Sequence, residues 1–173
     1  MKKILSYTLF VLLLVSLISC SNEANNSKEF TIETTLIAGG PLFEGSNTCQ
    51  AELTTELSSF LEENGIKKEE LVDVKLTSCV ITSDQFENLN LIESINMQMF
   101  SDNFPMQNVA VANPVEENIS EVSLKIADIQ EQIMPVLQEE TCYIVADVTI
   151  KEDLEDDLKL NTKLVFSINY YKQ

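Results

Sequence analysis

Histidine, arginine and tryptophan are all absent from the 173-residue sequence, and these absences exclude several kinds of functional site. Without histidine there can be no Ser–His–Asp triad and no metal centre built on imidazole ligands. Without arginine there are no bidentate clamps for phosphate or carboxylate, so phosphoryl transfer would depend on lysine and a metal alone. The sequence therefore does not predict an enzyme, and it indicates no cofactor and no metal site.

Positive charge is also scarce. The eleven basic residues, all lysines, are outnumbered by 28 acidic residues, and the formal net charge is −17. A charge of this size repels the phosphate backbone, which excludes nucleic acid as a partner. It also disfavours close contact with anionic lipid and is typical of a well-solvated surface. We interpret the acidity as a contribution to solubility, and an acidic recognition face is the alternative.

The N-terminus has the features of an export signal. Lys2 and Lys3 precede an apolar run from Ile4 to Ile18, which is a charged region followed by a hydrophobic one. A membrane-spanning helix needs about 20 apolar residues, so this run is too short to be a permanent span. The junction Leu17-Ile18-Ser19-Cys20 resembles the lipobox of bacterial lipoproteins.

This resemblance implies that residues 1–19 are a signal peptide and that Cys20 carries diacylglycerol through a thioether as the first residue of the mature protein. Cys20 could instead end an ordinary signal peptide or belong to an uncleaved anchor. Two or three acyl chains hold a protein firmly, because each buried methylene contributes about 0.8 kcal/mol. Ser21 stands where an inner-membrane retention signal would carry aspartate. We therefore expect a location in the bacterial envelope, at the outer rather than the inner membrane, and the leaflet stays open.

Removal of the leader leaves residues 20–173, a length that suits one domain with one core. The loss of Lys2 and Lys3 takes the net charge from −17 to −19. Residues 20–27 are rich in asparagine and serine, and we expect them to form a flexible tether. Residues 28–173 are then the folded domain.

Apolar and polar residues alternate in several segments of this domain, which is the period of half-buried strands. The expected strands cover residues 29–37, 72–80, 91–100, 109–112, 121–127, 142–150 and 158–170. Most connections between them are too short for right-handed crossovers, so the strands should pair antiparallel. The expected fold is mainly β: an antiparallel β-sandwich of immunoglobulin-like size with about seven strands.

One segment has helical spacing instead. Apolar residues recur three or four positions apart between residues 48 and 64, namely Cys49, Leu53, Leu57, Phe60 and Leu61. This pattern predicts one amphipathic helix, with Thr48 as its N-cap and Gly65 just beyond its end. Its polar face is acidic, so we expect it to pack on the sheet and not on a membrane. A shorter helix is expected within residues 128–137, where Pro135 limits its length.

The order of a strand, a helix, a strand pair, short strands and a long final strand resembles that of small β-sandwich lipoproteins of Bacteroidota. Residues 74–78, residues 92–95 and the terminal alternating strand carry this resemblance, which spans about residues 28–171. It implies a β-sandwich held at a membrane by lipid, and it brings no catalytic residues.

Two groups of residues are candidate sites. The loop at residues 152–157 has five carboxylates that could bind Ca²⁺, but it lacks the glycine and the spaced ligands of an EF-hand loop. A solvated turn is the favoured interpretation. Met97, Met99 and Met106 could form a soft apolar patch with nearby phenylalanines, yet alternation places Met97 and Met99 in the core.

Three cysteines follow the lipobox, namely Cys49, Cys79 and Cys142. Their spacing matches no zinc motif, and two of them fall in apolar, strand-like runs where a thiol packs as a small hydrophobe. We expect buried free thiols. One disulfide is the alternative in an oxidising compartment, and a reactive nucleophile is the least favoured, since no histidine can lower a thiol pKa.

Two classes of function remain. The first is a lipid-anchored, non-catalytic binding or structural module, whose partner would be a protein or a glycan. The alternative is a glycosidase-like hydrolase of envelope or extracellular polymers, which needs two carboxylates about 5–10 Å apart in a cleft. The acidic residues gather in loops and on outer strand faces, beside no evident aromatic platform for a sugar, so the module is favoured. A cleft with two facing carboxylates would favour the hydrolase.

Overall fold

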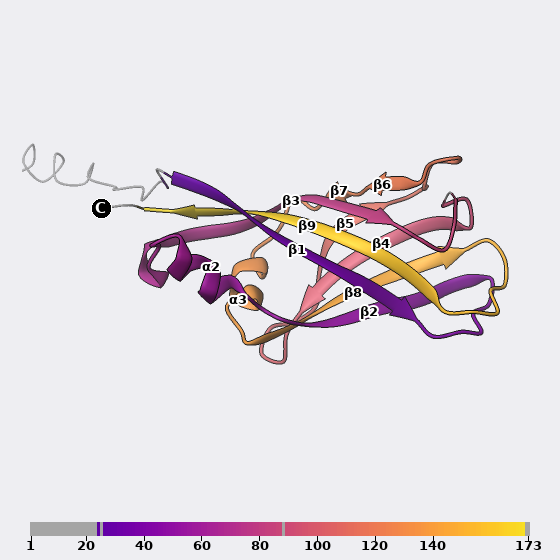
Figure 1. Ribbon diagram of the computed structural model, residues 1–173, viewed down its shortest axis with the longest axis horizontal. Coiled ribbons are helices and arrows are strands. Elements are labelled where there is room, and N and C mark those ends of the chain that lie inside the picture. The colour runs from indigo at the N-terminus through magenta and orange to yellow at the C-terminus, as the bar shows by residue number, and fades with distance from the viewer. Residues whose placement is uncertain (1–23, 25, 88, 172–173) are drawn as a thin grey trace, which may run out of the picture.

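The computed structural model describes residues 24, 26–87 and 89–171, and this part of the chain is mainly β (Figure 1). Its strands are β1 (Asn26–Ala38), β2 (Gly45–Thr54), β3 (Leu71–Thr82), β4 (Ile92–Phe100), β5 (Gln107–Ala112), β6 (Glu121–Ser123), β7 (Lys125–Ile126), β8 (Thr141–Ile150) and β9 (Leu158–Tyr170). Two short α-helices, α2 (Leu57–Glu63) and α3 (Ile133–Leu137), and the 3₁₀ turn η1 (Lys68–Glu70) complete the described elements. No helix among the described residues is both long enough and apolar enough to cross a bilayer.

The strands form one continuous sheet that bends and so makes two layers. All pairs are antiparallel, in the order β6-β3-β9-β1-β2-β8-β4-β5-β7. β1 pairs with β9 along its whole length, from Asn26 opposite Tyr170 to Ala38 opposite Leu158. With β2, by contrast, its pairing is Ile37 opposite Gln50. The sheet therefore turns at this point, and β6-β3-β9-β1 packs against β2-β8-β4-β5-β7 as a sandwich.

A short segment joins the open edges of the two layers. β6 pairs with β3 in the first layer and β7 pairs with β5 in the second. Leu124 lies between them, and its N–H donates to the carbonyl of Cys79 at 2.9 Å. Three residues later the N–H of Ala127 donates to the carbonyl of Val109 at 2.9 Å. The segment from residue 121 to 127 thus changes layers and gives the sandwich a barrel-like closure.

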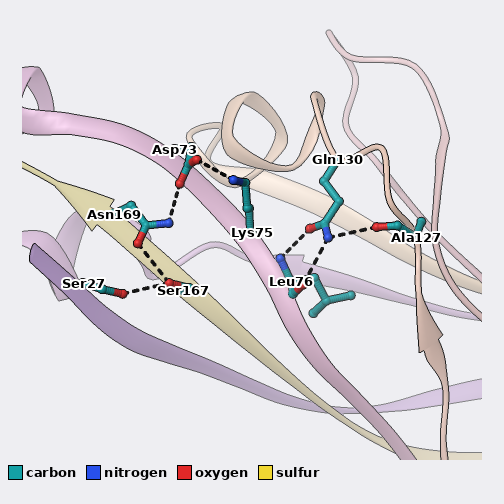
Figure 2. Close-up of polar contacts among 8 residues, drawn as sticks. All are labelled: Ser27, Asp73, Lys75, Leu76, Ala127, Gln130, Ser167 and Asn169. Carbon is teal, nitrogen blue, oxygen red and sulfur yellow. Dashed lines mark hydrogen bonds and ion pairs between the residues drawn. The ribbon is translucent and has the colours of Figure 1, made fainter. Parts of the chain in front are cut away.

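The side-chain amide of Gln130 extends this closure along the edge of β3 (Figure 2). Its Oε1 accepts from the N–H of Leu76 at 2.7 Å, and its Nε2 donates to the Leu76 carbonyl at 3.2 Å. The same Nε2 donates to the carbonyl of Ala127 at 3.0 Å. One side chain therefore makes the two hydrogen bonds that a neighbouring strand would otherwise supply.

Gln107 of β5 binds the backbone of the same segment from the edge of the other layer. Its Nε2 donates to the carbonyl of Ile129 at 3.1 Å, and its Oε1 accepts from the N–H of Gln132 at 3.0 Å. Two glutamine amides thus hold the segment that precedes α3 between the edges of β3 and β5.

The core lies between the layers and is filled by the alternating side chains predicted to face inward. Met97 and Met99 are fully buried there, as expected, whereas Met106 is 52% exposed. Phe30 of β1 contacts Phe60 of α2, with ring centroids 5.1 Å apart, so α2 covers one end of the first layer. The antiparallel β-sandwich predicted from the alternation is confirmed, with nine strands in the described residues instead of about seven.

The helix predicted over residues 48–64 is wrong in its first half. β2 occupies Gly45–Thr54, and the helix begins at Leu57. Cys49 and Leu53 are four residues apart, a spacing that fits a strand as well as a helix, and both lie on the inward side of β2 together with Ala51. Thr48 is an exposed strand residue, and the N-cap position belongs to Glu56.

The predicted end of this helix is confirmed. Gly65 has a φ of +64°, and its N–H donates to the carbonyl of Glu62. The N–H of Ile66 donates to the carbonyl of Leu61, and both of these side chains are buried. This is the Schellman arrangement, in which a left-handed residue lets the chain turn back after a helix. In α3, Pro135 lies within the first turn, where its missing N–H has no helical acceptor to lose.

The first strand begins slightly earlier than expected. β1 starts at Asn26, two residues before the predicted domain boundary at Lys28. The expected signal peptide, Cys20, and residues 21–23 and 25 of the expected tether lie outside the described residues.

Candidate functional site

The outer face of the second layer combines aromatic and amide side chains. It is built from positions that alternate with the buried residues of β8 and its neighbours. These outward residues are Thr48 and Gln50 of β2, Tyr143, Val145 and Asp147 of β8, Asn96, Gln98 and Phe100 of β4, and Asn108 and Val111 of β5. We call this surface the amide face. Among its ten residues the charged one is Asp147, while Glu52 of β2 points outward beside Tyr143 and Lys125 lies beside Val111.

A stacked aromatic pair occupies one end of the amide face. Phe100 and Tyr143 are opposite each other in β4 and β8, with ring centroids 4.9 Å apart and ring planes at 19°. Both side chains are partly exposed. The carboxylates of Asp102 and Glu52 raise the pKa of Tyr143, so its phenol stays neutral and can donate a hydrogen bond at physiological pH.

This pair corrects the expectation that the acidic residues lie beside no aromatic platform. Glu52 is the cross-strand neighbour of Tyr143, and Asp102 follows Phe100 by two residues. One signal was present in the sequence: both aromatics stand on the polar side of their alternating runs, where burial does not explain them.

Amide and hydroxyl groups, together with Asp147 and two valines, form the rest of the face. Val145 lies between Gln50 on β2 and Gln98 on β4. Asp147 accepts a hydrogen bond from the Thr48 hydroxyl at 3.1 Å and one from the Gln98 amide at 3.4 Å. Asn96 donates to the side-chain carbonyl of Asn108 at 3.2 Å. These contacts orient the amides of Asn96, Gln98 and Asn108, so this part of the face presents donors and acceptors in fixed positions.

The carboxylate loop at residues 152–157 is tied to the loop between β1 and β2. Asp153 Oδ1 accepts from the N–H of Glu44 at 2.8 Å, and Asp157 Oδ1 accepts from the N–H of Gly40 at 3.1 Å. Leu42 and Leu154 exchange backbone hydrogen bonds at 2.7 and 2.9 Å. Both loops lie at the end of the domain opposite the start of β1 (Figure 1). Among the described residues no group of three or more carboxylates or cysteines is arranged to hold a metal ion.

Several hollows among the described residues contain carboxylates and therefore bear on the hydrolase alternative, and those carboxylates are exposed or, like Asp73 beside Lys75, paired with a lysine. One, of about 370 Å³, is lined in part by Glu87, Glu152 and Asp153, all of them exposed. Another is a groove of about 440 Å³ across β1, β9, β3 and β6, where Glu33 forms a 2.8 Å ion pair with Lys163. A glycosidase acid must stay protonated near neutral pH, which requires burial or a close like charge. Exposed or lysine-paired carboxylates do not meet that need.

The three cysteines are buried free thiols, which confirms the expectation from the sequence. Burial raises the pKa of Cys49 and of Cys79 to about 12 and that of Cys142 to about 11. A thiolate is the reactive form of cysteine, so these side chains are inert at neutral pH and serve as packing groups.

No protein-family model matches the chain. No curated protein matches it either. Nine chains among the solved structures show a likeness, and for two of them it is slight. One is described as a carbohydrate-binding module of the β-sandwich superfamily, at 11% identity and a TM-score of 0.28, with 84% of this chain and 57% of that chain covered. The other comes from turnip yellow mosaic virus, at 12% identity and a TM-score of 0.27, with 84% of each chain covered. This chain thus spans little more than half of the first structure, and at these TM-scores neither likeness carries an inference.

Proposed function

We propose that the protein is a lipid-anchored protein of the bacterial envelope, held at the outer membrane through Cys20, and that its β domain is a non-catalytic binding module. The ligand binds on the amide face. The observation that carries this proposal is the contrast between that face and the rest of a chain with a net charge of −17. Four strands there expose amides, hydroxyls and an aromatic pair with two carboxylates, Asp147 near the centre and Glu52 opposite Tyr143.

The position of β1 supports the anchor. Five residues separate Cys20 from Asn26, the first residue of β1. Asn26 is opposite Tyr170, so the start of β1 and the end of β9 lie at one end of the domain, beside α2 (Figure 1). An anchor there leaves the strands of the amide face free along their length.

The proposal is tested by placing charge on the amide face without changing its shape. Gln50→Glu and Asn108→Asp are close to isosteric, and both side chains are exposed. Full-length protein extracted in detergent is mixed with purified envelope fragments, and the co-sedimented fraction is measured. We expect wild-type protein to co-sediment and the double variant to bind about tenfold more weakly or worse, because desolvating a new charge opposes binding.

Thr31→Glu serves as the control, since it adds a charge at an exposed site on β1, in the other layer. It should bind as the wild type does. Equal binding by all three proteins would show that the amide face is not the binding surface, and loss of binding in the control alone would place the site on the first layer.

A further inference from the structure

The charge of the amide face narrows the class of ligand. Asp147 at its centre already accepts hydrogen bonds from Thr48 and Gln98, so its charge is shared within the face. An anionic ligand would be repelled by a chain of net charge −17. A cationic ligand would find a denser set of carboxylates in the loop at residues 152–157. The face is therefore complementary to an uncharged ligand.

The hydrogen-bonding groups of the face restrict the class of ligand further. Each amide offers both donors and acceptors, and Gln50, Gln98 and Asn108 share one row across three strands with Val145. Neighbouring rows lie about 6.8 Å apart along the strands, and neighbouring strands about 4.8 Å apart. Such a grid suits a ligand with many hydroxyl groups, because a hydroxyl also both donates and accepts.

Apolar surface lies within the same grid. The partly exposed Phe100 and Tyr143 rings stand at one end, and Val111 of β5 is 40% exposed, whereas Val145, one row from the rings, is 6% exposed. Sugar rings carry C–H groups on their faces and hydroxyls around their edges, so they pack on aromatic or apolar surface while the hydroxyls reach polar neighbours. The neutral phenol of Tyr143 adds a hydrogen-bond donor beside the rings.

We infer that the ligand of the amide face is an uncharged polysaccharide, which lies across β2, β8, β4 and β5 and packs against Phe100 and Tyr143. This inference rests on the proposed function and adds the class of ligand to it.

Affinity electrophoresis gives the first test. Full-length protein in a non-ionic detergent is run through native gels that contain dextran, mannan, xyloglucan or galactomannan, with alginate as the acidic control polymer. We expect at least one uncharged polymer to retard the protein and alginate not to do so. Failure of all four, or retardation by alginate alone, would overturn the inference.

Variants then locate the site. Tyr143→Ala and Phe100→Ala should weaken retardation about tenfold or more, whereas Tyr143→Phe, which keeps the ring, should retain most of it. Gln50→Ala changes an exposed side chain of the same face. It measures the contribution of the face to binding even when an aromatic variant does not fold. Phe43→Ala is the matched control, because Phe43 is an aromatic residue outside the face and is 69% exposed. Equal losses in Phe43→Ala and Tyr143→Ala would contradict the assignment.

A second measurement separates this inference from the proposed function. Envelope fragments that bind the wild type are treated with periodate, which cleaves vicinal diols of sugars, or with protease. We expect binding to be lost after periodate and to survive protease. The reverse result would keep the binding module and refute the polysaccharide, while failure of the untreated fragments to bind the wild type would refute both. Self-association that requires Tyr143, without any polysaccharide binding, would show the face to be a contact between copies.

Discussion

The backbone of Gly40 lies directly against the loop at residues 152–157. A Cβ atom at Gly40 would stand 2.6 Å from the carbonyl carbon and oxygen of Asp156 and 2.7 Å from the carbonyl oxygen of Glu155. Because these are backbone atoms, they cannot move aside as the end of a flexible side chain can. We predict that Gly40→Ala lowers the free energy of unfolding by about 1–3 kcal/mol, measured by urea denaturation.

Gly39 supplies the control for this prediction. A Cβ at Gly39 meets nothing within 4 Å, so Gly39→Ala should change the stability by no more than about 0.5 kcal/mol. Similar losses in the two variants would mean that the contact between the two loops does not constrain Gly40.

For single residues, the sequence predicted which side chains are buried but not which side chains contact each other. Alternation placed Met97 and Met99 in the core, because the period of a strand is a local property. The stacking of Phe100 on Tyr143 depends on the register between β4 and β8, and no local pattern determines that register.

Among the elements, β3 has an edge that a side chain completes. Gln130→Ala would remove the acceptor for the Leu76 N–H and the donor to the Leu76 carbonyl. Since Leu76 is a buried residue, we predict a loss of about 1–3 kcal/mol in the free energy of unfolding. Hydrogen exchange of the Leu76 amide should also become faster.

Gln130→Glu separates the two hydrogen bonds. It keeps an acceptor for the Leu76 N–H but turns an oxygen towards the carbonyls of Leu76 and Ala127. We expect it to destabilise the protein while Leu76 stays partly protected from exchange. Glu131→Ala, a change at an exposed neighbour, is the control and should leave both measurements unchanged. Unaltered exchange at Leu76 in Gln130→Ala would refute the role of this amide.

Long alternating elements were predictable, and short or ambiguous ones were not. β8 and β9 contain enough periods to exclude a helix, and their expected and observed ranges nearly coincide. In β2 the spacing of Cys49 and Leu53 fits the period of a strand as well as that of a helix. Because a helix does follow at Leu57, the pattern predicts a helix that starts too early. The division of residues 121–127 into β6 and β7 follows from two different partner strands, which the segment itself does not reveal.

For the whole molecule, the main prediction is attachment at a membrane, because it determines where the protein would meet its ligand. Mass spectrometry of the N-terminal peptide of the native protein should find Cys20 as the first residue, carrying diacylglycerol, as the junction of residues 17–20 implies. A Cys20→Ser variant should lose the lipid and leave the membrane fraction. An unmodified peptide that begins elsewhere would contradict the anchor.

The class of fold was predictable at this scale, but the order of the strands was not. Short connections imply antiparallel pairing, whatever the partners are. The partners themselves are set by contacts such as that of Ser27 with Ser167, whose hydroxyls are 2.8 Å apart although the residues are 140 positions apart in the chain (Figure 2). Pairing over such distances depends on how all the strands fit together.

The pairing of β1 with β9 also sets the timing of folding. β9 lies between β3 and β1, so both of these strands lack their central neighbour until the last residues of the chain are available. Contacts this distant form slowly, because a long loop must close before they contribute. In the proposed export, a chain that enters the membrane from its N-terminal end would therefore stay unfolded, and so open to translocation, until its C-terminus follows. A nascent chain cut short before Leu158 would expose two unpaired strand edges, which mark it for aggregation or proteolysis.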